Sequence, residues 1–367
     1  MNHSRLLKKK FTNMDVPRRK FLHQLSTGTI MMPLIAGDTG HLHSKLTPSD
    51  PQVLKPQKLR PGDVIGLISP AGAVYESEPY EVAKEALEAM GLQVKLGKHL
   101  KDRYGHLAGE DDDRARELNK MFSDRNVHAI ICLRGGFGAA RILDKLDYKM
   151  IRKNPKVFIG YSDITALQLA LYKKAGIVTF HGPVGISSWG KFSRRYFSNL
   201  LFNNQLMSFK NPPKQESEWV QTENRTRTIH PGKARGRLLG GNLSVLCGLI
   251  GSAYLPSFKG SLLFLEDVNE ELYRIDRLMS QLQLSGLLDE INGFIFGKCT
   301  RCLPGGGYGS LTFDEIIDHY IKPLKIPAFS GSMIGHIDSK FTLPVGTEAE
   351  MDADKGTFQL LERALHD

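Results

Sequence analysis

Short apolar runs alternate with segments of helical periodicity from residue 62 to about residue 183. The run "DVIGLISPAG" is typical of a buried strand that ends in a turn, and residues 77–90 then carry apolar side chains at helical spacing. Further strands are expected at 92–97, 127–136, 156–160 and 177–183, and further helices at 111–123, 139–146 and 163–175. Repeated strand–helix units of this kind predict a parallel sheet with helices on both faces.

The pattern fades between about residues 185 and 232, where the sequence is polar and aromatic and contains prolines. It resumes near Gly236 with "GRLLGGNLSVLCGLIGS". Two strands are then expected at 261–267 and 291–298, and two helices at 273–284 and 313–322. The final alternation "TEAEMDADKGTFQLLE" predicts a β-hairpin that turns at Lys355 and Gly356. The chain is therefore expected to be an α/β protein with a second domain after the crossover.

Composition and charge narrow the class of protein. With 367 residues, 41% of them hydrophobic and 24% charged, the chain suits a soluble protein of two domains. No apolar run approaches the roughly 20 residues that span a bilayer, so no integral membrane segment is expected in the mature protein. The formal charge is +10, but residues 1–24 hold seven lysines and arginines against one aspartate. Because no later segment has a basic stripe interleaved with aromatics, nucleic acid is not an expected partner.

The basic start resembles a bacterial twin-arginine export signal. In "PRRKFLHQLSTGTIMMPLIAG" two arginines precede Phe21 and Leu22 and a moderately apolar stretch. We expect a signal at residues 1–37 and a linker at 38–57, with export to the periplasm. The alternative is a disordered basic tail, which would leave the protein in the cytoplasm. The true start and the cleavage site stay open at this stage.

The four cysteines do not make a disulfide scaffold in a chain of this length. Cys132 and Cys247 lie in apolar runs and are expected to be buried. Cys299 and Cys302 have C-x-x-C spacing, but no second ligand pair stands nearby, so no zinc site is expected. The pair forms either a local disulfide or an uncoordinated pair in a loop.

Chemistry in an open parallel sheet is expected beyond the carboxyl ends of the strands. Four turns of this sequence occupy such positions, and one of them, "GYSD", carries Ser162. This serine could cap the helix that follows it or act as a nucleophile. The four turns are Ser69-Pro70-Ala71-Gly72, Arg134-Gly135-Gly136-Phe137-Gly138, Tyr161-Ser162-Asp163 and His181-Gly182-Pro183.

A serine hydroxyl needs a base to remove its proton, and a carboxylate commonly orients that base. His336 in "MIGHIDSK" is the best histidine, with His181 as its rival; His181 could instead be a structural residue hydrogen-bonded beneath its turn. Glu266 ends the apolar run "LLFLE" and suits the orienting acid, with its neighbour Asp267 as the competitor. These residues make a serine hydrolase the leading hypothesis.

The turn "RGGFG" allows two interpretations. Its backbone N–H groups could cradle a phosphate, but the turn lacks the lysine and Ser/Thr of a P-loop. The same turn could supply one N–H of an oxyanion hole, with the N–H of Asp163 as the second donor. We prefer the oxyanion hole, because it gives both loops a role in one site.

Six blocks occur here in the order seen in the L,D-carboxypeptidase family, which includes the microcin C immunity peptidases. They are "RGGFGAARIL", "FIGYSDITAL", "HGP", "GRLLGGNLSVL", "FLEDVNEELYRIDR" and "GHIDSKFTLPVG", and the resemblance runs from about Leu59 to Leu361. It implies a Rossmann-like parallel-sheet N-terminal domain, a smaller β-rich α+β C-terminal domain and a homodimer. The domains are expected at 58–190 and 233–367, with the crossover at 191–232.

The resemblance also implies roles for individual residues. Ser162 would be the nucleophile, Glu266 the orienting acid and His336 the base, with no metal or cofactor. The N–H groups of Gly136 and Asp163 would form the oxyanion hole.

The substrate implied by the resemblance is an amide between an L-centre and a terminal D-residue, as in murein tetrapeptide ending in D-Ala. A cation, either Arg134 or Arg274, would bind its free carboxylate. Three alternatives stay open: an immunity-like hydrolase of another amide, a noncatalytic murein-peptide-binding protein, and a nucleotide-binding protein that uses "RGGFG".

Overall fold

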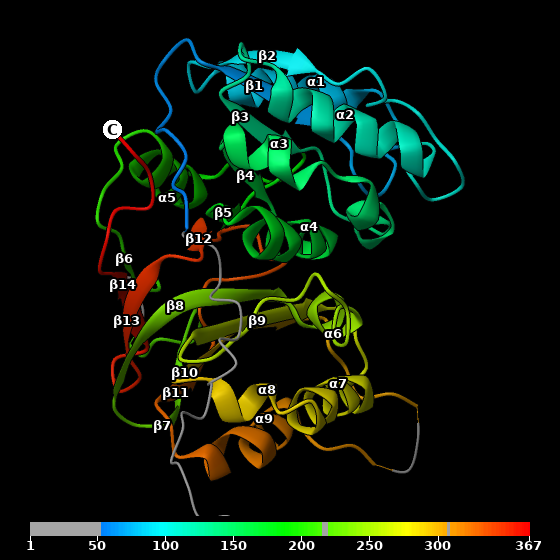
Figure 1. Ribbon diagram of the computed structural model, residues 1–367. Helices are drawn as coiled ribbons and strands as arrows, with labels where there is room; N and C mark the ends of the chain where they lie inside the picture. The colour runs from blue at the N-terminus through cyan, green and yellow to red at the C-terminus, as the bar shows by residue number, and fades with distance from the viewer. Residues whose placement is uncertain (1–52, 215–218, 307–308) are drawn as a thin grey trace, which may run out of the picture. The chain divides into compact units, whose positions relative to one another are not determined.

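A computed structural model describes residues 53–214, 219–306 and 309–367 (Figure 1). The predicted export signal and most of the predicted linker lie outside the described residues. The last part of that linker, from Val53, is bonded to the body of the protein, since the N–H of Leu54 donates to the carbonyl of Gly176 at 2.6 Å. Two sheets organise the described residues.

The first sheet has the order β12-β5-β4-β3-β1-β2. Five of its strands are parallel, which confirms the sheet predicted from the alternating pattern. The sixth, β12, comes from late in the chain and pairs antiparallel with β5 at the edge. The strands are β1 (Val64–Ile68), β2 (Gln93–Leu96), β3 (Ala129–Cys132), β4 (Val157–Gly160), β5 (Thr179–His181) and β12 (Leu343–Val345).

The helices between these strands follow the expected order but differ in type. The helix expected at 139–146 is a 3-10 helix, and the one expected at 163–175 passes through 3-10, α and π geometry. A further short helix, α3, precedes β4. The elements are α1 (Glu78–Glu88), α2 (Asp111–Ser123), η1 (Ala139–Lys145), α3 (Tyr148–Lys153), η2 (Ser162–Ile164), α4 (Thr165–Ala170) and η3 (Leu171–Ala175).

The second sheet has the order β6-β14-β13-β8-β9-β10-β11-β7. Strands β8 to β11 are mutually parallel, and the remaining pairs are antiparallel. Strands β13 and β14 form the predicted hairpin, with Asp352 opposite Thr357. The strands are β6 (Ser208–Phe209), β7 (Arg227–His230), β8 (Lys233–Asn242), β9 (Leu262–Val268), β10 (Gly293–Thr300), β11 (Ala328–Ser330), β13 (Glu348–Asp352) and β14 (Thr357–Leu360).

Helices α7, α8 and α9 lie together beside this sheet (Figure 1). Helix α9 begins with a reciprocal capping box between Thr312 and Glu315, which satisfies two of the exposed N–H groups at its start. No helix in the described ranges is long and apolar enough to cross a membrane. The helices of this half are α6 (Leu243–Gly248), α7 (Leu272–Leu284), α8 (Leu287–Glu290), α9 (Phe313–Ile321) and η4 (Lys322–Leu324).

The segment 191–232, where the sequence pattern fades, contains regular structure. It forms α5 (Lys191–Leu201) and the short strands β6 and β7. Helix α5 buries Tyr196, Phe197 and Leu200 at helical spacing, a pattern that the surrounding polar and proline-containing sequence obscures. The predicted domain boundaries stay a prediction.

Candidate active site

The loops that follow four parallel strands of the first sheet lie against one another, as the fold predicts. The N–H of Gly72, after β1, donates to the carbonyl of Gly135, after β3, at 3.0 Å. The N–H of Gly182, after β5, donates to the carbonyl of Gly160 at the end of β4, at 2.9 Å. Gly135 also lies against Ser162, which joins the loops after β3 and β4. The four turns singled out in the sequence therefore lie side by side at the carboxyl ends of the strands, and this row of turns is called the edge below.

Ser162 occupies a strained backbone position on this edge. Its φ is +65°, a left-handed conformation that non-glycine residues rarely adopt. A Cβ atom on Gly135 would come within 2.7 Å of the Ser162 Cβ, so the neighbouring loop needs a glycine there. The half-buried serine does not cap the helix, because neither η2 nor α4 has a side-chain cap. The geometry resembles that of a displayed nucleophile.

Asp163 ties the serine turn to the glycine-rich turn. Its carboxylate accepts a hydrogen bond from the N–H of Ala139 at 2.8 Å, just after "RGGFG". Burial raises the pKa of Asp163 to about 6, although the bond from Ala139 and the charge of Arg114 act in the opposite direction. The backbone N–H groups of Asp163 and Gly136, the predicted oxyanion donors, therefore belong to two loops that are fastened together.

Arg114 is a buried residue of this edge that sequence reasoning missed. Its guanidinium donates to the carbonyls of Pro70 and Gly138, and it also pairs with Asp111. These hydrogen bonds attach the loops after β1 and β3 to helix α2. Its signal lies in α2, where Arg114 shares the buried face with Leu118 at helical spacing.

Glu266 of the second sheet is joined to His336, which lies in the loop between β11 and β12. Glu266, near the end of β9, is fully buried, and its Oε2 accepts a hydrogen bond from Nδ1 of His336 at 2.8 Å. Burial by itself would raise the pKa of Glu266, but the bond and charge of His336, with smaller contributions from His181 and Asn242, lower it. Gly335 has φ +124°, and a Cβ there would lie 3.0 Å from Oε2. The glycine thus permits the close approach that the sequence suggested.

Asp267, the competitor of Glu266, has a different set of partners. Its carboxylate accepts hydrogen bonds from the N–H of Ser244 at 2.9 Å and from the N–H of Val268 at 2.8 Å. Burial and the charge of Glu266 raise the pKa of Asp267 to about 6. In the described ranges Asp267 bonds to no histidine, and it serves the start of α6.

His181, the rival base, lies beneath the edge. It is 2% exposed, and neither ring nitrogen has a hydrogen-bond partner among the described residues. Its ring packs edge-on against Phe264, with centroids 5.4 Å apart. Burial lowers the pKa of His181 to about 4, so the ring is neutral at pH 7. The hydrogen-bonded structural role that the sequence allowed for His181 is not seen.

Asn242 connects the two sheets, and it too was missed. Its N–H donates to the hydroxyl of Thr165 in α4 at 3.0 Å, and its side-chain amide donates to Oε1 of Glu266 at 3.3 Å. A Cβ on the preceding Gly241 would come within 2.5 Å of Thr165. The "GGN" sequence therefore sets β8 close against the helix that follows the serine.

His336 contacts the residue that precedes the serine. The rings of Tyr161 and His336 pack edge-on with centroids 4.8 Å apart, and Tyr161 directly precedes Ser162. Ser162 Oγ and His336 Nε2 form no hydrogen bond, and neither atom has another partner in the part of the chain that is described. Hydrogen bonds of this kind often tighten only when substrate binds, so Nε2 remains available as a base.

The two arginines expected to bind a carboxylate differ in position. Arg134 donates to the carbonyl of Ala73 at 2.9 Å and lines a groove of about 530 Å³ with Tyr75, Val82 and Ile186. Arg274 lies on α7, where it contacts the hydroxyl of Tyr273 at 3.2 Å and two nearby glutamates. Substrate binding by either residue stays a prediction.

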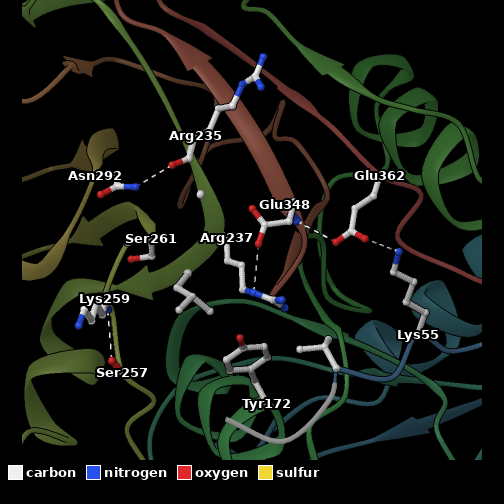
Figure 2. A pocket seen from close by; sticks show the side chains of 14 residues that line it. Lys55, Tyr172, Arg235, Arg237, Ser257, Lys259, Ser261, Asn292, Glu348 and Glu362 are labelled. Atoms are coloured by element: carbon white, nitrogen blue, oxygen red, sulfur yellow. Dashed lines mark hydrogen bonds and ion pairs between the residues drawn. The ribbon is translucent and has the colours of Figure 1, made fainter. Parts of the chain in front are cut away.

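A separate cavity of about 650 Å³ lies at the opposite, amino-terminal ends of β9 and β10 (Figure 2). It is lined by charged side chains that pair with one another. Lys55 contacts Glu362 at 2.7 Å, and Arg237 contacts Glu348 at 3.1 Å. Its lining contains no member of the predicted triad. The cavity is therefore large, but its charges are mostly neutralised.

The cysteines are now assigned. Cys132 and Cys247 are buried and unpaired, as expected. Cys299 and Cys302 form a disulfide with 5.4 Å between their Cα atoms, and Cys299 lies opposite Asp267 in the pairing of β10 with β9. Within the described ranges, no three histidine, cysteine or acidic side chains gather as metal ligands would.

Comparisons with known proteins relate this arrangement to a family. The profile described as the LD-carboxypeptidase N-terminal domain matches residues 65–182, and that of the C-terminal domain matches residues 235–351. The probable murein peptide carboxypeptidase of Bacillus subtilis (strain 168) is 38% identical over 310 residues, which cover 83% of this chain and 93% of that protein.

Two solved structures are similar over most of this chain. The wild-type apo structure of the microcin C7 self-immunity protein matches with a TM-score of 0.77 and 28% identity, covering 85% of this chain and all of the other. The muramoyltetrapeptide carboxypeptidase of Oxalobacter formigenes matches with a TM-score of 0.68 and 28% identity, covering 81% and 97%.

Proposed function

This chain belongs to the LD-carboxypeptidase family, and from that membership and the geometry above we propose a serine-type L,D-carboxypeptidase. Its substrate would be murein tetrapeptide, and it would hydrolyse the amide bond to the terminal D-Ala. The observation that carries the proposal is the strained turn at Ser162 beside the hydrogen-bonded pair of Glu266 and His336. The murein substrate is supported by the names of the relatives in Bacillus subtilis and Oxalobacter formigenes.

The first half of the reaction forms an ester on the serine. Nε2 of His336 takes the proton of the Ser162 hydroxyl as Oγ attacks the amide carbon. The N–H groups of Gly136 and Asp163 stabilise the negative charge on the carbonyl oxygen. The C–N bond then breaks, and the imidazolium gives its proton to the leaving amine of D-Ala.

The second half returns the enzyme to its starting state. Water attacks the ester carbon while Nε2 of His336 accepts its proton, and the Ser162 oxygen leaves with that proton. Glu266, buried and ionised, stabilises the imidazolium in both halves and keeps Nδ1 as the donor. Each turnover consumes one water and releases one D-Ala and one tripeptide.

Location and assembly are also part of the proposal. An exported protein would meet murein in the periplasm, which rests on the resemblance of residues 1–37 to a twin-arginine signal. A homodimer rests on the family resemblance. Fractionation of cells and light scattering of the purified protein would test these two points.

The test is mass spectrometry of murein tetrapeptide incubated with the wild-type protein and with Ser162→Ala. We expect loss of one alanine residue with the wild type and a rate at least about 10³-fold lower with the variant. An unchanged tetrapeptide with folded wild-type protein would reject this substrate.

A second candidate substrate is included because the microcin C7 self-immunity protein is so similar in structure. One of its solved structures contains aspartyl sulfamoyl adenosine. Hydrolysis of that compound, with no action on tetrapeptide, would favour an immunity-like hydrolase. Binding of tetrapeptide without hydrolysis would favour a noncatalytic murein-peptide-binding protein.

A further inference from the structure

Lys340 is a buried cation beside the candidate active site that the reaction described above does not use. It follows His336 by four residues, is 5% exposed, and holds its ammonium 4.6 Å from the centre of the Tyr161 ring. The same ring packs against His336. Within the part of the chain that the structure describes, this ammonium forms no hydrogen bond and no ion pair.

A lysine whose side chain is almost wholly buried loses part of the hydration of its ammonium, so buried lysines are nearly always paired. A contact with a tyrosine ring offsets only a part of that loss. The two acids whose charges act on Lys340 have other hydrogen-bond partners. Glu266 accepts from His336 at 2.8 Å, and Asp338 accepts from the hydroxyl of Ser188 at 3.1 Å. Lys340 therefore lacks an anion in the protein without substrate.

The charge is nevertheless present at neutral pH. Burial lowers the pKa of Lys340 to about 8, while the charges of Asp338 and Glu266 act to raise it. A pKa of about 8 leaves most of the ammonium protonated at pH 7. The site thus holds a positive charge ready for an incoming anion.

We propose that Lys340 receives the terminal carboxylate of the substrate and so makes the enzyme an exopeptidase. The proposal rests on the proposed carboxypeptidase function. In a peptide, an oxygen of the terminal carboxylate lies about 4–5 Å from the carbonyl carbon of the last amide bond. The Tyr161 ring contacts both the ammonium of Lys340 and the ring of His336, so the cation and the base lie against the same residue. This places the cation at a distance that suits a carboxylate next to the bond being cleaved. A peptide with a blocked end would leave the ammonium unpaired.

The two arginines considered from the sequence fit this role less well. Arg274 is exposed and already contacts Glu270 and Glu271 within 4.0 Å. Arg134 already donates to the carbonyl of Ala73 and faces the outer groove, where it suits the remainder of the peptide. Of the three cations, Lys340 is the one that is buried without an anionic partner.

The test compares two peptides that differ only at the end of the chain: tetrapeptide with a free terminal carboxylate and the same peptide with a terminal amide. For the wild type we expect kcat/KM to be about 10- to 100-fold higher for the acid, the range for a hydrogen bond to a buried charge. In Lys340→Met this preference should fall to within about twofold, because the acid loses much more kcat/KM than the amide. Lys340→Arg should retain part of the preference.

Two control variants show whether the effect is specific. Lys156 is another buried lysine, whose ammonium donates to the carbonyl of Met121 at 2.9 Å. Lys156→Met should lower stability and leave the acid-to-amide ratio unchanged. Arg134→Met should weaken the binding of both peptides to a similar extent.

Several results would overturn the proposal. If Lys340→Met slowed both peptides equally, the residue would only position Tyr161 and His336. If Arg134→Met abolished the preference instead, Arg134 would be the carboxylate receptor. If the folded wild type cleaved neither peptide, the proposed function would fail, and calorimetry with Ser162→Ala would still test Lys340. Equal binding of acid and amide there would reject its role.

Discussion

The cavity in Figure 2 and the edge around Ser162 are both rich in charge, but they treat that charge differently. In the cavity, Lys55 and Arg237 face glutamates at 2.7 and 3.1 Å. At the edge, Lys340 has no anionic partner and His181 no hydrogen bond among the described residues. The comparison of these two regions teaches that a large cavity does not by itself identify the site, whereas Lys340 and His181 are buried beside the candidate triad without such partners in the described part of the chain.

The largest effect is expected for Glu266, and Glu348 in the cavity is its matched control. Glu266→Gln should lower kcat about 10³- to 10⁴-fold, because a neutral amide no longer stabilises the imidazolium of His336. Glu348→Gln, in the cavity, should leave kcat within about twofold of the wild type. Steady-state kinetics with tetrapeptide measures both, and equal losses in the two variants would erase the distinction between the regions.

A smaller effect is expected at Gly135, where the neighbouring serine leaves no space for a side chain. Gly135→Ala would put a Cβ 2.7 Å from that of Ser162, so the serine must move. A displacement of the nucleophile by about 1 Å should cost on the order of 100-fold in kcat. Gly190→Ala is the matched control, since a Cβ there meets nothing within 4 Å. Wild-type activity in Gly135→Ala would show that the contact does not position the serine.

The burial of His181, whose ring nitrogens have no hydrogen-bond partner among the described residues, predicts that the stability of the protein depends on pH. The pKa of His181 is about 4 in the folded protein against an ordinary value of 6.5, so the unfolded chain binds the extra proton between these pH values. His181 therefore makes the free energy of unfolding fall as the pH drops below about 6.5. Between pH 7 and pH 5 its contribution should be about 2 kcal/mol.

Urea unfolding of the wild type and His181→Leu at both pH values isolates this contribution. Asp163 and Asp267, whose pKa values are raised to about 6, act in the opposite sense, but they are present in both proteins. The wild type should lose about 2 kcal/mol more than the variant on acidification. An identical loss would mean that His181 titrates normally in the folded state.

The smallest effect is expected in the cavity. Arg237→Met removes an ion pair in which both side chains are about 40% exposed, so the free energy of unfolding should fall by no more than about 1 kcal/mol. Activity on tetrapeptide should not change. A loss of activity greater than about fivefold would connect the cavity to the reaction.

Local pattern was sufficient for much of the fold. The helix expected at 111–123 is α2, and the parallel strands and the final hairpin lie where periodicity put them. Strands β11 and β12 were missed, because each has three residues and is defined by pairing with distant segments rather than by its own sequence.

The candidate site shows the same limit. Glu266 and His336 stand out because each follows an apolar run, and the structure brings them within 2.8 Å. Asn242 and Lys340 act through contacts with residues far along the chain, and no local pattern reveals such contacts. Family resemblance joined the blocks, but the contacts of these side chains needed the structure.

The most direct test is whether Ser162, which follows β4, and His336, in the loop between β11 and β12, act as one unit. Ser162→Ala, His336→Ala and the double variant should be compared on tetrapeptide against the uncatalysed rate. The double variant should be no more than about threefold slower than the slower single variant, because either change already removes the whole function of the pair. Losses that multiply in the double variant would show that the two residues act independently, and would contradict this prediction.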